Sequence, residues 1–251
     1  MKTIPVVIKY GGHAMTVPEL SRAFARDLTD LARGGRSFIV VHGGGPQISS
    51  LLKRLNIESR FEQGLRVTDD ATMEAVEMVL AGQVNKAVVA QFVQQGVRAC
   101  GVCGRDASLL HAEVRRPELG NVGEVTKVDP AVLACLMDGG FMPVVAPVAE
   151  GPQGRALNVN ADTAAGAVAG ALAAEYFVLM SDVPGVLDKQ GVLQPRLTRA
   201  DIDAFKADGT ITGGMLPKIE NALSAVEAGV ERVIITLSTA IDGRHGTVIS
   251  R

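Results

Sequence analysis

Three short glycine runs in this chain lie beside lysine, histidine or apolar residues. They are KYGG at Lys9–Gly12, HGGG at His42–Gly45 and TGGMLPK at Thr212–Lys218. Glycine loses more conformational entropy on folding than any other residue, so consecutive glycines in a folded chain need a physical reason. One reason is a plain turn. The other is that a large, charged ligand must lie against bare backbone.

The residues around these glycines favour an anionic ligand. HGGG leads into a predicted helix with Pro46 in its first turn, and a helix N-terminus offers unpaired N–H groups and a partial positive charge. Lys218 lies near another predicted helix start, where a cation opposes the helix dipole unless an anion binds there. Lys9 follows three apolar residues and must reach solvent or a partner. With Asp162 at an expected helix N-cap, these residues predict a phosphate site with two lysines and one carboxylate.

Several other kinds of active site have no motif in the sequence. Neither G-x-x-x-x-G-K-[ST] nor G-x-G-x-x-G occurs, which excludes a P-loop enzyme and removes the main support for a dinucleotide dehydrogenase. No H-E-x-x-H and no Ser/His/Asp order occurs, and no metal-ligand spacing relates His13, His42, His111 and His245. Cys100 and Cys103 have C-x-x-C spacing, but no second pair accompanies them, so we interpret them as small residues packed in a strand.

The composition is that of an ordinary soluble globular chain. Of 251 residues, 47% are hydrophobic and 21% are charged, with a formal net charge of -2. No basic excess indicates nucleic acid, and no Lys/Arg run indicates an anionic membrane. No apolar run reaches the roughly 18 residues of a membrane span, and Lys9 interrupts the first apolar stretch, which argues against a signal peptide. Three cysteines do not make a disulfide framework, so we expect a cytoplasmic location.

Apolar, β-branched runs alternate along the chain with segments of helical periodicity. The predicted strands are Ile4–Lys9, Ser37–His42, Val97–Val102, Met142–Val148, Tyr176–Met180 and Arg232–Thr236. The predicted helices include one that follows the candidate cap Thr16, one over Asp129–Asp138 and one over Pro217–Ala228. This alternation predicts an α/β fold with a mostly parallel sheet covered on both faces. Residues 104–128 interrupt the alternation and predict a hairpin excursion.

Six motifs, in order along the chain, resemble those of the N-acetylglutamate kinases in the amino-acid kinase family. They are VIKYGG, VVHGGGPQI, GLRVTD, LNVNADTAAG, LMSDVPGVLD and GGMLPKIENALSAVEAG. GLRVTD and LNVNAD distinguish the acetylglutamate members, whereas the glycine loops also fit aspartate, carbamate and uridylate kinases. The resemblance implies a single amino-acid kinase domain over residues 1–251, a three-layer α/β/α sandwich. An acceptor-binding, dimerising lobe would cover about 1–155 and a nucleotide-binding lobe about 156–251.

The same resemblance implies roles for residues that act on the phosphoryl group and the nucleotide. Lys9 and Lys218 would stabilise the transferring phosphoryl group, and Asp162 would hold both lysines in place. The nucleotide side would be lined by Gly11, Gly12, Asp182, Val183, Pro184, Gly185, Val186, Leu187, Ile211, Thr212 and Gly213. The expected nucleotide is ATP, and Mg²⁺ would arrive with it, held mainly by phosphate oxygens and water. We expect no dedicated metal site on the protein.

Four further residues would bind the acceptor. Gly44 and Gly45 would offer backbone N–H groups, while Asn158 and Arg66 would hold the acceptor, Arg66 by a fork onto a carboxylate. The implied reaction is ATP-dependent phosphorylation of the side-chain carboxylate of N-acetyl-L-glutamate to N-acetyl-L-glutamyl 5-phosphate, the second step of arginine biosynthesis. Because the acceptor is already an anion, no general base is needed, and catalysis consists of positioning and electrostatics.

Two other functions fit part of the pattern. A related kinase that acts on a carrier-linked aminoadipate in lysine biosynthesis would share the glycine loops, but Arg66 within GLRVTD favours acetylglutamate. A non-catalytic sensor of nucleotide or amino acid would need neither lysine, so the joint presence of Lys9, Asp162 and Lys218 counts against it.

The expected partner is a second copy of the chain. The predicted helix Thr72–Gln95 carries more apolar residues than one core face requires, namely Met73, Val76, Val79, Leu80, Val84, Val88 and Phe92. Arginine-inhibited hexamers of the family carry an extra N-terminal helix, whereas the first strand here is expected within a few residues of Met1. We therefore expect a homodimer that does not respond to arginine. The tail TLSTAIDGRHGTVISR is also shorter than is usual in the family, which typically has a helix before the final strand.

Overall fold

The computed structural model describes residues 4–237 and 241–250, which form two compact units. The first unit comprises Met1–Ile39 and Ala165–Arg251, and the second comprises Val40–Ala164. The expected division near residue 155 therefore differs from the observed one. The reason is that β1 (Val6–Tyr10) pairs in parallel with β11 (Tyr176–Ser181), which joins the N-terminal segment to the C-terminal part of the chain.

The first unit is built on a mostly parallel sheet. β11 lies between β1 and β13 (Arg232–Leu237), both parallel to it, and β14 (Thr247–Ser250) is antiparallel to β13 and parallel to β12 (Arg196–Leu197). The helices are α1 (His13–Thr16), α2 (Pro18–Arg33), α8 (Arg199–Ala207) and α9 (Met215–Glu227). β1, β11 and β13 are apolar runs buried on both faces, as the sequence predicted.

Small residues let α7 (Ala161–Ala171) approach α9 closely. A side-chain carbon at Gly170 would lie 2.7 Å from the Cβ of Ala228, and one at Gly166 would lie 3.7 Å from the Cβ of Ala225. The predicted cap of α7 was wrong. Asp162 is the second residue of the helix, and the side chain of Asn160 accepts hydrogen bonds from the N–H groups of Asp162 and Thr163.

Thr16 is also not a cap, because it closes the short helix α1. The next helix, α2, begins at Pro18 after Val17, with no capping side-chain hydrogen bond. No helix in the described part of the chain has both the length and the apolarity that a bilayer span requires.

The second unit contains a parallel sheet in the order β2 (Phe38–His42), β8 (Met142–Ala146) and β5 (Ala99–Cys103). The helix α6 (Ala131–Asp138) packs on β8, and α3 (Gly45–Arg54) follows β2. The predicted strand Met142–Val148 is interrupted at Pro147, which has no N–H for a strand ladder. Val148–Glu150 instead forms β9 in a second sheet.

That second sheet is a small closed barrel. It consists of β6 (Leu110–Val114), β7 (Val122–Val128), β9 and β10 (Ala156–Val159). β6 and β7 are antiparallel, which confirms the predicted hairpin, and 3₁₀ turns lie at Asp106–Ser108, Pro117–Leu119 and Pro152–Gly154. β10 runs parallel to β7 and places Asn158 opposite Val122. A separate hairpin joins β3 (Phe61–Glu62) to β4 (Leu65–Arg66).

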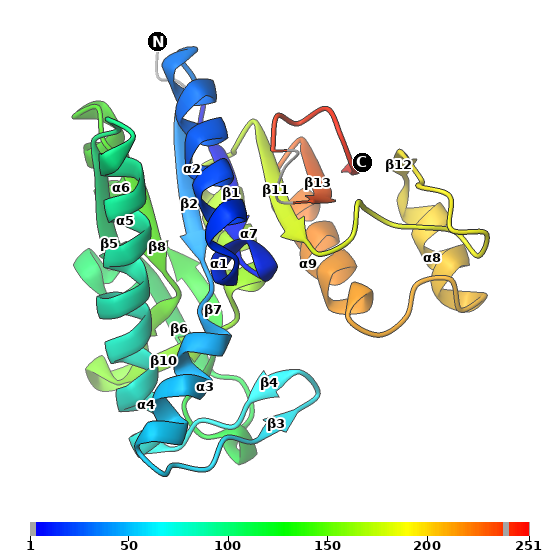
Figure 1. Cartoon of the computed structure of the whole chain (residues 1–251). Coiled ribbons are helices and arrows are strands. Elements are labelled where there is room, and N and C mark those ends of the chain that lie inside the picture. Colours follow the sequence, from blue (N-terminus) through cyan, green and yellow to red (C-terminus); the bar gives the residue numbers. More distant parts are fainter. Residues whose placement is uncertain (1–3, 238–240, 251) are drawn as a thin grey trace. The chain divides into compact units, whose positions relative to one another are not determined.

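One long helical rod runs through α4 (Asp70–Glu77), a π-helical segment Met78–Val84 and α5 (Asn85–Gln94) (Figure 1). The rod contacts α3, β5, β8 and β10. The predicted dimer surface was therefore wrong, since this packing turns a broad helical face into core. The seven apolar residues that were predicted to form the surface are buried, with at most 5% exposed, namely Met73, Val76, Val79, Leu80, Val84, Val88 and Phe92.

Candidate active site

The glycine loop Gly43–Gly45 joins β2 to α3 in the second unit. A side-chain carbon at Gly44 would lie 2.6 Å from Cδ2 of Leu80, so a larger residue there would have to displace the Leu80 side chain of the helical rod. Gly45 is exposed and begins α3, with Pro46 in the first turn as predicted. The loop therefore presents bare backbone at a helix N-terminus, an arrangement that suits an anion.

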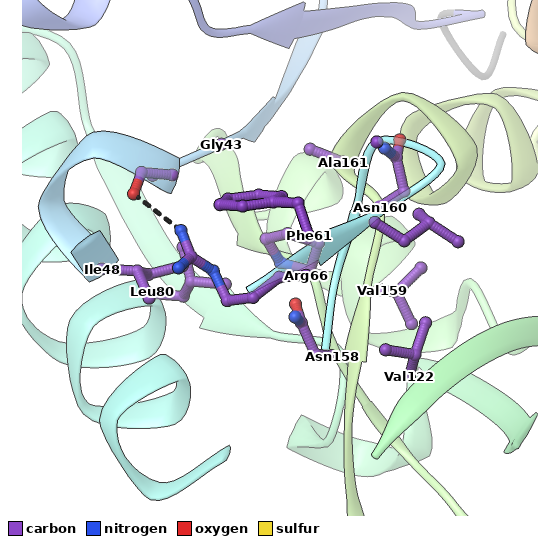
Figure 2. A pocket seen from close by; sticks show the side chains of 15 residues that line it. Gly43, Ile48, Phe61, Arg66, Leu80, Val122, Asn158, Val159, Asn160 and Ala161 are labelled. Atoms are coloured by element: carbon purple, nitrogen blue, oxygen red, sulfur yellow. Dashed lines mark hydrogen bonds between the residues drawn. The ribbon is translucent and has the colours of Figure 1, made fainter. Parts of the chain in front are cut away.

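A cavity of about 160 Å³ lies beside this loop (Figure 2). It is lined by Gly43, Gly44, Gly45, Ile48, Phe61, Gly64, Leu65, Arg66, Leu80, Val122, Pro147, Asn158, Val159, Asn160 and Ala161. The structure thus brings together all four residues that were predicted to bind the acceptor, from different elements of one unit. The apolar side chains around them would exclude water from a small acid.

Arg66 places a buried guanidinium at this cavity, with only 6% of the residue exposed. One Nη1–H donates to the hydroxyl of Ser59, and Nη2 donates to Ser49 Oγ at 2.9 Å and to the Gly45 carbonyl at 3.1 Å. These three bonds use three of the five guanidinium N–H groups and leave two that can donate to a ligand. No carboxylate among the described residues forms an ion pair with it, and burial lowers the pKa of Arg66. A buried cation in this state calls for an anionic ligand.

Asn158 is held by neighbouring polar groups. Its Nδ2 donates to the hydroxyl of Thr68 at 3.1 Å, and its backbone N–H donates to the Asn121 carbonyl at 2.8 Å. The Thr68 hydroxyl in turn donates to the Arg66 carbonyl at 2.7 Å. This chain couples β10 to β4 and leaves Asn158 with one amide hydrogen and its carbonyl oxygen for a ligand.

Phe61 was not predicted from the sequence, although it covers the guanidinium. Its ring centre lies 4.6 Å from Cζ of Arg66, and the residue is 60% exposed (Figure 2). The β3–β4 hairpin that carries Phe61 is held by Arg116, which donates to Gln63 Oε1 at 3.0 Å and lies 3.9 Å from Glu62. An aromatic residue before a Gly-containing turn and an arginine is the sequence signal that could have identified it.

The first unit holds Lys9, Lys218 and the residues that were predicted to line the nucleotide, whereas Asp162 belongs to the second unit. A side-chain carbon at Gly11 would lie 2.7 Å from Nζ of Lys9, and one at Gly12 would lie 2.7 Å from Oδ1 of Asp182. Gly12 also has a φ of 66°, which favours glycine. The structure therefore brings together Lys9, both glycines and Asp182, where β1 and β11 end side by side.

The remaining predicted nucleotide residues lie on two further segments of this unit. Gly185 has a φ of 151° and lies against Thr247, whose hydroxyl accepts a hydrogen bond from the Val186 N–H at 2.8 Å. Among the others, Asp182, Val183 and Pro184 are exposed, Leu187 pairs with Leu193, Ile211 is buried, and Thr212 and Gly213 precede α9. Lys218 lies in the first turn of α9 and is partly buried.

The amino acid kinase family matches this chain over residues 5–237. The chain belongs to the amino acid kinase family. An acetylglutamate kinase from Sphingopyxis alaskensis is 55% identical to this chain over 251 residues, and the alignment covers 95% of this chain and 82% of that protein. An acetylglutamate kinase from Sinorhizobium fredii is 51% identical over 243 residues, with 92% of this chain and 82% of that protein aligned.

Three solved structures share the fold of this chain. The Streptococcus mutans protein smu.665 superposes with a TM-score of 0.86 at 31% identity, covering 98% of both chains. N-acetylglutamate synthase from Neisseria gonorrhoeae, complexed with coenzyme A and N-acetyl-glutamate, superposes with a TM-score of 0.84 at 23% identity over 99% of this chain and 59% of that one. Giardia carbamate kinase superposes at 0.74 with 16% identity, covering 100% and 99%. The last two likenesses establish the fold alone.

Proposed function

We propose that this chain phosphorylates the side-chain carboxylate of N-acetyl-L-glutamate with ATP, giving N-acetyl-L-glutamyl 5-phosphate and ADP in arginine biosynthesis. The names of relatives at 50–55% identity support this reaction. The observation that carries it on this chain is Arg66, a buried guanidinium without a described carboxylate partner, in a cavity bordered by the glycine loop. An acid with two carboxylates fits this arrangement, since one can meet Arg66 while the other lies at the loop.

In this proposal, Arg66 and Asn158 bind and orient the acceptor. The free N–H groups of Arg66 meet one carboxylate, and the free amide groups of Asn158 suit either a carboxylate oxygen or the acetylamide N–H. The backbone N–H groups of Gly44 and Gly45 meet the attacking carboxylate and the phosphoryl oxygens. Leu65, Leu80 and Val122 give the acetyl group an apolar surface.

Lys9 and Lys218 act on charge rather than on protons. Two anions must approach each other, and an ammonium at about 4 Å from a transferring oxygen contributes about 4 kcal/mol at an effective dielectric constant of 20. Asp162 sets the positions of the lysines. These roles follow the family's motifs, residue by residue. The segments Asp182–Leu187 and Ile211–Gly213 take the nucleotide side.

Mg²⁺ enters the proposal as part of the nucleotide substrate. In the described part of the chain, no group of three or more His, Cys, Asp or Glu residues could hold a metal ion by itself. The phosphates and water provide most ligands of such an ion, and Asp182 beside Gly12 is a carboxylate that the proposal assigns to the nucleotide side.

ADP release with Mg–ATP across a panel of acceptors tests this function. The panel comprises N-acetyl-L-glutamate, L-glutamate, L-aspartate, a carrier-linked aminoadipate and UMP. Turnover should be fastest with N-acetyl-L-glutamate. Faster turnover with the carrier-linked substrate would identify the lysine-pathway kinase instead. Binding of nucleotide or acid without turnover of any acceptor would identify a sensor.

The proposal extends to location and assembly. The three cysteines Cys100, Cys103 and Cys135 are free, which suits a reducing cytoplasm. A homodimer is proposed from the family resemblance. The structure leaves two large apolar side chains exposed on the helical rod for such a contact, Met78 at 61% and Val93 at 53%.

A further inference from the structure

His42 is fully buried directly before the glycine loop, and the proposed reaction gives it no task. Its Nδ1 lies 2.8 Å from the Gly43 carbonyl oxygen, and its Nε2 lies 3.2 Å from Nδ2 of Asn85. A carbonyl can only accept a hydrogen bond, so Nδ1 carries the proton and Nε2 accepts from the asparagine amide. The contacts therefore select one neutral tautomer of the ring.

The bond from His42 fixes the direction of the next peptide N–H. The Gly43 carbonyl and the Gly44 N–H belong to one planar trans peptide unit, in which C=O and N–H point in opposite directions. When the carbonyl is held toward the buried ring, the N–H must point away from it. The Gly44 N–H is one of the two backbone donors that the proposed function assigns to the reacting oxygens.

Asn85 is fixed as tightly as the histidine that it contacts. It is fully buried, and its Nδ2 also donates to the Val144 carbonyl at 2.9 Å and lies 3.3 Å from that of Val102. Its Oδ1 accepts from Nζ of Lys86 at 3.0 Å. The amide thus connects the ring on β2 to the backbones of the two neighbouring strands, β8 and β5.

Two local features of the chain accommodate this amide. A side-chain carbon at Gly101 would lie 1.9 Å from Oδ1 of Asn85, so the glycine of the CGVC motif makes room for it. Asn85 also comes directly after the π-helical segment Met78–Val84. One residue more per π turn rotates the next part of the helix by about 100° relative to a continuous α-helix, so this segment determines the face from which Asn85 projects.

We propose that Asn85 is a positioning residue for the phosphoryl transfer: through His42 it holds the Gly43–Gly44 peptide so that the Gly44 N–H faces the reacting oxygens. This inference rests on the proposed function. It accounts for a buried histidine, a buried asparagine, the CGVC glycine and the π-helical segment by one arrangement.

Two replacements of His42 separate its two hydrogen bonds. An asparagine amide nitrogen falls near the Nδ1 position and can still donate to the Gly43 carbonyl, whereas a glutamine amide falls near Nε2 and cannot. His42→Gln should therefore lower kcat roughly 10²-fold, the scale for losing one aligned donor, with the KM for acetylglutamate within about 3-fold. His42→Asn should retain at least about tenfold more kcat than His42→Gln. Thermal unfolding midpoints of the two variants control for packing, since both replace the same buried ring.

A second pair of variants acts on Asn85 without touching the loop. Gly101→Ala should displace the amide and lower kcat by a factor approaching that of His42→Gln. Cys100→Ala on the same strand, β5, is the control, because successive side chains of a strand point to opposite faces and Cys100 makes no described hydrogen bond to Asn85. If Gly101→Ala does not fold, Lys86→Ala removes the exposed ammonium that anchors Asn85 Oδ1 and should lower kcat several-fold.

Equal kcat in His42→Asn and His42→Gln, or wild-type kcat in both Gly101→Ala and Lys86→Ala, would overturn the inference. Absence of turnover in the wild-type protein would overturn the proposed function instead. In that case the NMR chemical shift of the Gly44 amide still tests whether His42 orients the Gly43–Gly44 peptide. It should change in His42→Gln and stay close to the wild-type value in His42→Asn, and an unchanged shift in both would contradict the positioning role.

Discussion

At the scale of single residues, the proposed binding of the acceptor depends most on Arg66. Its guanidinium is desolvated among Ser49, Ser59 and the Gly45 carbonyl, so its remaining N–H groups are available where water is scarce. We expect Arg66→Ala to weaken acetylglutamate binding by about 1.5–3 kcal/mol and to leave ATP binding nearly intact. Calorimetry with each ligand measures both effects, and Arg60→Ala, an exposed arginine in the same segment, is the control. Equal weakening of ATP binding would contradict an acceptor role.

Lys9 and Lys218 are two further single residues on which the proposal depends. They are expected to act on the transferring phosphoryl group rather than on the acceptor. Each is expected to stabilise charge that develops during transfer, so Lys9→Ala and Lys218→Ala should each lower kcat by about 10²–10³, with smaller changes in KM. Steady-state kinetics of folded variants measure this, with Lys127→Ala as an exposed control in β7. Near-normal turnover in either variant would remove that lysine from the mechanism.

At the scale of elements, the β3–β4 hairpin depends on a side chain from another segment. Arg116 lies just after β6 and holds the hairpin by Gln63 and Glu62, next to Phe61 and Arg66. We expect Arg116→Ala to raise the KM for acetylglutamate about 3- to 30-fold through loss of the charge-assisted hydrogen bond to Gln63 and the ion pair with Glu62, without changing the KM for Mg–ATP.

The neighbouring Arg115 provides a matched control for this hairpin prediction. It pairs with Glu124 on the barrel at 3.4 Å and makes no described bond to the hairpin. Arg115→Ala should therefore leave both KM values unchanged. A rise in KM of the same size in both variants would mean that the barrel, and not the hairpin contact, is responsible.

At the scale of the whole molecule, His42 links folding stability to pH. Burial, opposed by the Gly43 carbonyl bond and reinforced by the Lys86 ammonium, lowers the pKa of His42 to about 4. The unfolded chain binds a proton near pH 6.5, so between pH 6.5 and 4 the unfolded state holds more protons than the folded state. The contribution of His42 to the free energy of unfolding should be fully present above pH 6.5 and should fall by roughly 3 kcal/mol as the pH decreases to 4.

Denaturant unfolding at several pH values measures that loss. The same series on His42→Asn isolates it, because asparagine does not titrate and other groups contribute equally to both proteins. The two proteins should differ in slope only within this window. Parallel curves would show that His42 does not remain neutral in the folded state.

Assembly is the second property of the whole molecule. A homodimer should give about twice the chain mass of 26.2 kDa in light scattering. If the exposed face of the helical rod forms the contact, Met78→Asp combined with Val93→Asp should shift the mass to one chain without lowering the unfolding midpoint of the monomer, because both side chains lie outside the core. A dimeric mass in this variant would place the contact elsewhere.

The sequence by itself determined the central strands and the family of this protein. Continuous apolar runs such as Tyr176–Ser181 form strands because burial on both faces leaves few alternatives, and glycine runs at strand ends indicate backbone contact with a ligand. Arg66 and Asn158 were predicted to bind the acceptor because their motifs match those of a family. Local rules failed where two neighbours competed for one task, as when Asn160 rather than Asp162 capped α7.

Only the tertiary structure decided which surfaces become core and which polar groups meet. The apolar excess of the helical rod predicted a dimer contact, but strands far along the chain cover it. The contact of Asn85 with His42 joins residues 43 positions apart, and that of Asn158 with Thr68 joins residues 90 apart. Periodicity and turn chemistry report on neighbours within a few residues, so pairs at such separations become visible only when the sheet and the barrel bring their elements together.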